Sequence, residues 1–188
     1  MEIAIPTEST KIPTLKIVLW ISLASIVMLF AGLTSAYLVR EAEGNWIQFV
    51  LPKAFYVSTA LIILSSLTIQ MAISAIKKNK LQTVKTYLII TLALGIGFVF
   101  AQFFGWSSLV DQKVYFVGNP AGSFVYALTG LHLAHLIGGI LALTITSGKS
   151  ILEKYSANNY LGISLCSIYW HFLDGLWIYL FVFLALNH

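Results

Sequence analysis

The chain has 188 residues, of which 59% are hydrophobic and only 10% are charged, and its mean hydropathy is +0.87. Soluble domains carry about 25% charged residues, so this composition excludes a water-soluble fold. A single cysteine, Cys166, excludes an internal disulfide and a cysteine-rich metal cluster.

The chain contains five stretches that are long and apolar enough to cross a membrane. Residues 1–16 are polar and contain two prolines, so we expect a cytoplasmic tail here and not a signal peptide. A spanning helix needs about 20 mainly apolar residues. The stretches that qualify cover residues 17–39, 54–76, 84–106, 123–145 and 162–186. The sequence therefore predicts an all-α membrane protein, with one five-helix transmembrane domain over residues 17–188.

Lysine and arginine are distributed unequally between the two predicted sides of the membrane. Three of the eleven, Arg40, Lys53 and Lys113, fall on one side, and the other eight fall in the tail and in the second and fourth loops. Basic residues near span ends favour the cytoplasm. We therefore expect the N-terminus inside and the C-terminus outside. The same bias explains the net charge of +4 without a nucleic-acid partner.

Two predicted spans carry small residues at every fourth position. Such ridges mark helix faces that pack closely in lipid. The sequence predicts that the ridges of the third and fourth spans face each other: Ala93, Gly97, Ala101 and Gly105 in one, and Gly130, Ala134, Gly138 and Ala142 in the other.

Four polar residues in the last two spans are the candidate site. His132 and His135 lie three residues apart, as do His171 and Asp174, so each pair lies on one helix face. Counting about 1.5 Å per residue puts His132 and Asp174 at the same depth, which makes them the favoured pair if the two helices touch. Asp174 needs a partner or a proton, because an unpaired charge at this depth is costly.

Three hypotheses fit this constellation. Imidazole and carboxylate groups on facing helices resemble the ligands of helical metal sites. A membrane carboxylate flanked by histidines is also typical of a proton path. The third hypothesis is a structural hydrogen-bond network that holds two helices together.

Two motifs, TGLHLAH at residues 129–135 and YWHFLDGLW at residues 169–177, resemble subunit III of the haem-copper oxidases, the cytochrome c oxidase subunit III family. The first span, with LASIVMLFAGLTSAYLV, resembles the family's corresponding helix. The resemblance covers nearly the whole chain and is to the short, five-helix bacterial members.

This resemblance implies a non-catalytic subunit of a proton-pumping respiratory oxidase in the bacterial inner membrane. Haem and copper are then held by the partner subunits I and II, and this chain holds no cofactor or metal of its own. Bound phospholipid and a larger respiratory supercomplex are further expected partners. By this analogy His132, His135, His171 and Asp174 form a structural polar network. The alternative is a stand-alone membrane metalloenzyme or a small proton-coupled transporter built on those four residues.

Two positions depart from the family pattern. Many members carry a glutamate in the first of these helices, where this chain has Ile26. Another glutamate, three residues beyond the glutamine that matches Gln102, is replaced by Gly105. No role of either carboxylate can therefore be carried over, and a proton-handling role inside this chain is weakened.

Overall fold

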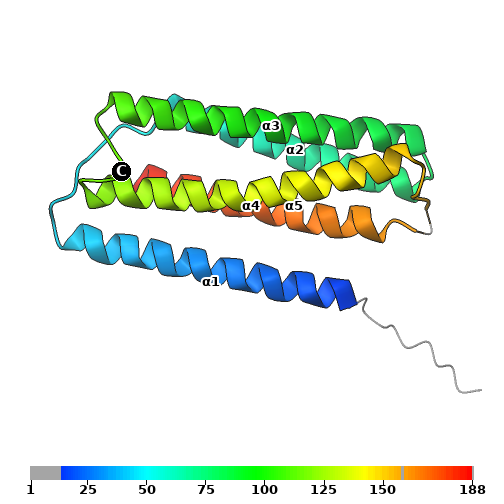
Figure 1. Ribbon diagram of the computed structural model, residues 1–188, viewed down its shortest axis with the longest axis horizontal. Coiled ribbons are helices and arrows are strands. Elements are labelled where there is room, and N and C mark those ends of the chain that lie inside the picture. Colours follow the sequence, from blue (N-terminus) through cyan, green and yellow to red (C-terminus); the bar gives the residue numbers. More distant parts are fainter. Residues whose placement is uncertain (1–13, 158, 188) are drawn as a thin grey trace, which may run out of the picture.

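The computed structural model describes residues 14–157 and 159–187, and five long helices dominate this part of the chain (Figure 1). Most of the expected tail, residues 1–13, lies outside the described residues. The helices are α1 (Thr14–Ala42), α2 (Lys53–Lys77), α3 (Leu81–Asp111), α4 (Pro120–Ile151) and α5 (Leu161–Leu186).

All five helices are long and apolar enough to cross a membrane, which confirms the predicted fold class. Each expected span lies inside one of them. The helices are 25 to 32 residues long, which exceeds the roughly 20 residues that the hydrocarbon layer requires. Most of the helices therefore extend beyond the apolar stretches predicted from the sequence. The start of α4 is fixed by Pro120 in its first turn and by Asn119, whose side chain accepts a hydrogen bond from the Ala121 amide.

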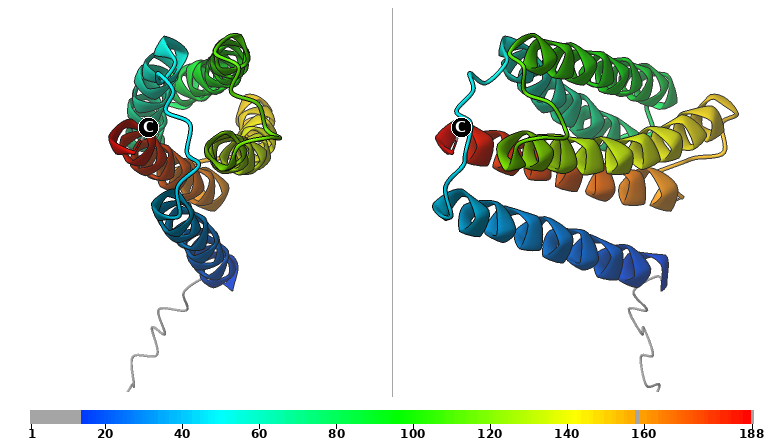
Figure 2. Two further views of the ribbon diagram at one scale, coloured as in Figure 1. Left: turned by 90° about the vertical axis from the view of Figure 1, so that its left-hand side faces the viewer. Right: turned by 60° about the vertical axis from the view of Figure 1, so that its left-hand side comes forward.

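Helices α2 to α5 form a four-helix bundle, and α1 lies outside it, beside α4 and α5 (Figure 2). The first described residues of α1 and the end of α5 lie at opposite ends of the bundle (Figure 1). Only four residues of α1 are buried, and three of them, Phe30, Thr34 and Tyr37, belong to its second half. This helix is therefore held mainly through the half that leads into the α1–α2 connection.

Two side-chain amides fix the connection between α1 and α2 across the end of the bundle. Gln112 accepts a hydrogen bond from the Val50 amide at 2.9 Å and donates to the Val50 carbonyl at 3.0 Å. Asn119 accepts from the Ile47 amide at 3.3 Å and donates to the Asn45 carbonyl at 2.9 Å. Because both amides bond to backbone groups, they satisfy polar atoms that the extended connection leaves without partners.

The predicted contact between the small-residue ridges of α3 and α4 is wrong. Two residues of the α3 ridge instead face α2: a Cβ atom on Gly97 would lie 3.6 Å from Leu61, and one on Gly105 would collide with the Phe55 ring. On α4, Ala134 and Gly138 are exposed. The bulky side chains of α2 fill the α3 ridge, so α4 meets its neighbours through another face.

Candidate functional site

Two tryptophans of α5 occupy the centre of the bundle. Trp170 and Trp177 are fully buried. The Trp170 indole donates to the Ser65 hydroxyl of α2 at 2.9 Å, and the Trp177 indole donates to the Thr59 hydroxyl of the same helix, also at 2.9 Å. Since a buried indole N–H needs a partner, these bonds fix the rotation of α5 against α2.

Close packing around Trp170 depends on two glycines that the ridge pattern did not identify. A Cβ atom on Gly95 of α3 would lie 2.8 Å from the Trp170 ring. A Cβ atom on Gly139 of α4 would lie 3.0 Å from Leu173 and 3.4 Å from Trp170. The indole ring therefore packs between α3 and α4 at two positions where glycine leaves room for it. Gly139 stands directly beside Gly138 in the sequence, so the required small residue is one position away from the predicted ridge.

His132 of α4 lies in an aromatic environment. It is fully buried, and its ring centroid lies 5.1 Å from Trp177 and 5.8 Å from Phe98. Neither ring nitrogen has a hydrogen-bond partner among the described residues. Its contacts are therefore those of an aromatic core residue, between α3 and α5.

Asp174 of α5 is directed towards α2. Its side chain is buried, with 3% of the residue exposed, and Ser66 lies beside the carboxyl group. The Ser66 hydroxyl makes its hydrogen bond with His171 instead, at 2.6 Å. Neither carboxyl oxygen has a partner of good geometry within the described ranges. The expected pairing of His132 with Asp174 is therefore wrong: the ring of Trp177 covers the imidazole, and the carboxyl group points to another helix.

The other two candidate histidines also have separate partners. His135 bonds through Nδ1 to the Leu131 carbonyl of its own helix at 2.7 Å, and its carbonyl accepts from the Tyr169 hydroxyl at 3.1 Å. His171 bridges two side chains of α2, with Nδ1 2.6 Å from Ser66 and Nε2 3.3 Å from Gln70. Within residues 14–157 and 159–187, no three His, Cys, Asp or Glu side chains come together as metal ligands.

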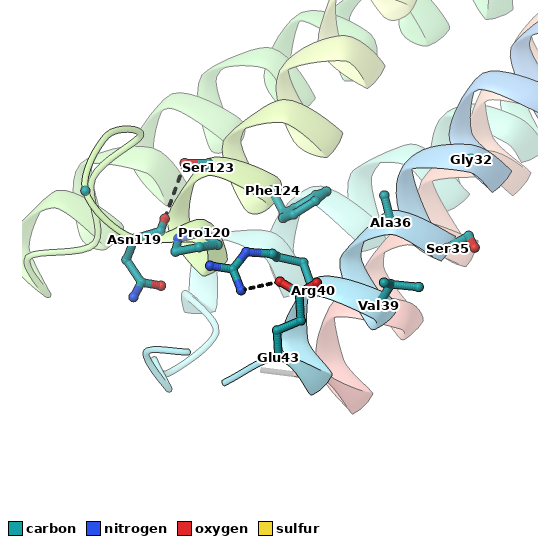
Figure 3. A pocket seen from close by; sticks show the side chains of 11 residues that line it. Gly32, Ser35, Ala36, Val39, Arg40, Glu43, Asn119, Pro120, Ser123 and Phe124 are labelled. Carbon is teal, nitrogen blue, oxygen red and sulfur yellow. Dashed lines mark hydrogen bonds and ion pairs between the residues drawn. The ribbon is translucent and has the colours of Figure 1, made fainter. Parts of the chain in front are cut away.

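A wide pocket of about 800 Å³ opens between α1 and the start of α4 (Figure 3). Its walls are small or apolar, with Gly32, Ala36 and Val39 on α1 and Phe124 on α4. Arg40 lies at its charged side, 2.8 Å from Glu43. Both partners are partly exposed, so the pair contributes little to stability and leaves the guanidinium available to another anion.

A second, smaller groove of about 380 Å³ lies between α1 and α5. It is almost entirely apolar, with Val27 and Phe30 on one side and Phe172 and Tyr179 on the other. His171 also lines it, which places an imidazole in an apolar groove at membrane depth.

Comparison of the chain with known proteins shows which family it belongs to. The family model for cytochrome c oxidase subunit III matches residues 10–186. The chain belongs to the cytochrome c oxidase subunit III family. It is 34% identical over 170 residues to a probable cytochrome c oxidase subunit 3 of Nocardia farcinica, covering 87% of this chain and 82% of the relative. It is 31% identical to a cytochrome c oxidase subunit 3 of Bacillus sp. PS3, covering 86% and 80% of the two chains.

Within the described residues the four polar residues have separate surroundings and do not form the single network that the resemblance implied. The chain is a subunit III of a haem-copper oxidase, a multi-pass protein of the bacterial plasma membrane, and it works in a complex with other oxidase subunits. The two positions that depart from the family pattern hold no carboxylate. Ile26 is half-buried and packs against the core, and Gly105 is buried against Phe55.

Sequence reasoning missed the residues of α2 that receive these side chains. Ser65, Ser66 and Gln70 supply the partners of Trp170 and His171. A signal was present, because hydroxyl and amide side chains in a spanning helix tend to bond to neighbouring helices. These residues carry no charge, so the cost of burying a charge does not single them out in the sequence.

Proposed function

We propose that the chain is a non-catalytic subunit of a proton-pumping respiratory oxidase, which packs on subunit I and supports its stability and its proton uptake. The observation that carries the proposal is the family match over nearly all of the five-helix domain. In this proposal haem and copper belong to subunits I and II. The polar residues of α4 and α5 orient helices and hold no redox centre.

Support for proton uptake is indirect in this proposal. The family carboxylates are replaced at Ile26 and Gly105, so the chain does not relay protons through those positions. Its contribution comes from packing, because a rigid bundle of four helices presents a fixed surface to a neighbouring subunit. The charge distribution favours an N-terminus inside the cell, since Lys77, Lys78, Lys80, Lys85, Lys149 and Lys154 lie in or next to the connections α2–α3 and α4–α5.

The pocket between α1 and α4 is the proposed site for a phospholipid. Arg40 would meet the phosphate, and the small and apolar wall of Gly32, Ala36 and Val39 would meet an acyl chain. Arginine suits phosphate because its planar group offers several donors. Replacing Arg40 with Gln should remove one phospholipid per chain, measured by phosphorus analysis of the detergent-extracted protein. Lys113→Gln at the same end of the bundle is the control and should leave the lipid content unchanged.

The function is tested by preparing the oxidase from cells that lack this chain and comparing it with the complete enzyme. We expect oxygen consumption to begin at a similar rate, then to decline during turnover, with fewer protons taken up per electron. Restoring the chain should restore both properties. An oxidase that keeps its full rate and its proton stoichiometry without the chain would overturn the proposal.

A further inference from the structure

One polar side chain at lipid depth is exposed on the outside of the bundle. Gln70 of α2 is exposed, and it lies seven residues before Lys77, where the helix ends. At 1.5 Å per residue this is about 10 Å from the helix end, within the hydrocarbon layer. An exposed amide is therefore present where lipid tails offer no hydrogen-bonding group.

The geometry around Gln70 leaves half of its amide unused. Its Oε1 atom lies 3.3 Å from Nε2 of His171. Since an amide oxygen only accepts, Nε2 of the imidazole carries the proton, and Nδ1 then accepts from the Ser66 hydroxyl at 2.6 Å. This chain of bonds fixes the amide against α5. Its nitrogen has no hydrogen-bond partner in the part of the chain that the structure describes.

Three other exposed polar residues of the spans do not share this feature. Ser22, Ser25 and Thr144 each donate a hydroxyl to the carbonyl four residues earlier in their own helix. A single bond satisfies a hydroxyl in this way, whereas a glutamine amide carries two N–H donors, and neither donor of Gln70 has a partner among the described residues. An acceptor from outside the chain would satisfy them.

The surface beside Gln70 suits a helix. His171, the partner of Gln70, also lines the apolar groove between α1 and α5, and Leu67 and Met71 flank the amide with exposed apolar side chains. In the end-on view of Figure 2, α2, α5 and α1 follow one another along one side of the molecule, with α3 and α4 on the other. Acyl chains would fill the groove but would leave the amide without an acceptor. A protein helix can fill the groove and also supply the acceptor.

We propose that the face formed by α1, α5 and α2 is where a transmembrane helix of another oxidase subunit docks, with a hydrogen-bond acceptor opposite the Gln70 amide. This inference rests on the proposed function, because it takes the partner from the oxidase complex. Removing the amide with Gln70→Leu should weaken the association about threefold, the typical effect of one hydrogen bond between membrane helices.

Two positions of equal depth test the face. Leu67 of α2 and Leu141 of α4 are both exposed, at 53% and 60%, and each lies ten residues before the end of its helix. A photo-crosslinking amino acid is placed at either position in the full chain, in its own membrane. After illumination we expect an adduct with a larger oxidase subunit from position 67 and none from position 141. Haem that co-purifies with the tagged chain is measured in parallel without illumination.

The outcomes separate the inference from the proposed function. A subunit adduct from position 141, or only lipid adducts from position 67, would overturn the docking face while co-purified haem leaves the oxidase assignment intact. Absence of haem from every preparation would overturn the assignment and the inference together. The Gln70→Leu chain should yield about one third of the position-67 adduct, and Thr144→Val, at the same depth on α4, should yield the full amount. Equal yields from both variants would reject the role of the amide.

Discussion

Helices α5 and α1 cross the same membrane but are held in different ways. α5 buries Trp170 and Trp177, and each donates a hydrogen bond to a hydroxyl of α2. α1 has four buried residues along 29 positions, its Thr34 hydroxyl bonds with Tyr179 of α5 at 2.9 Å, and its Tyr37 hydroxyl donates to the Asn187 carbonyl at the end of α5. The bundle of α2 to α5 is thus complete by its own contacts, whereas α1 leaves much of its surface to lipids or other subunits.

The largest expected difference concerns one tryptophan in each region. Trp170 is fully buried, whereas Trp20 of α1 is 59% exposed. Trp170→Ala should lower the free energy of unfolding by about 3 to 5 kcal/mol, because it leaves a large cavity. Trp20→Ala should leave it unchanged. Thermal midpoints in detergent measure both, and equal losses would contradict the contrast.

Glycines give a second comparison of intermediate size. Gly95→Ala would place a methyl group 2.8 Å from Trp170 and should cost about 1 to 3 kcal/mol through overpacking. Gly32→Ala on α1 meets no atom within 4 Å. It should be neutral or slightly stabilising, since alanine favours a helix more than glycine does. A destabilised Gly32 variant would mean that α1 packs more closely than described.

The attachment of α1 can be weakened with a single hydroxyl. Thr34→Val removes the bond to Tyr179 and should cost about 0.6 kcal/mol, the average for such bonds between membrane helices. Ser25→Ala is the control, because its hydroxyl bonds only within α1. Proteolysis of the α1–α2 connection in detergent should be faster for Thr34→Val alone.

The smallest effect is expected at Asp174. Because neither carboxyl oxygen has a partner within residues 14–157 and 159–187, Asp174→Leu should leave the thermal midpoint unchanged or raise it. If Asp174 were paired with His132, the substitution would instead lower the midpoint, because it would leave the imidazole without its partner. A midpoint that falls by several degrees would contradict this expectation and would show that the carboxyl group has a stabilising partner.

The sequence predicted the five spans and the family, because hydropathy over 20 residues and two contiguous motifs are properties of the chain itself. It did not predict which residues contact one another, because those contacts depend on how each helix is rotated about its axis. His132 and Asp174 have equal depth, as expected, but their directions are set by Trp177 and by the hydroxyls of α2. The α3 ridge was recognised correctly as small, yet its partner helix was wrong, because spacing along one helix does not specify which neighbour supplies Phe55.

The chain works as part of an oxidase, and we expect the redox centres to belong to its partner subunits. This expectation is tested most directly by tagging the chain, extracting it gently from its own membrane, and recording a reduced-minus-oxidised spectrum and the metal content of the purified material. We expect haem and copper to co-purify with larger partner subunits, and the tagged chain to hold neither once those subunits are removed. A lone protein that retains its own zinc or iron would contradict it.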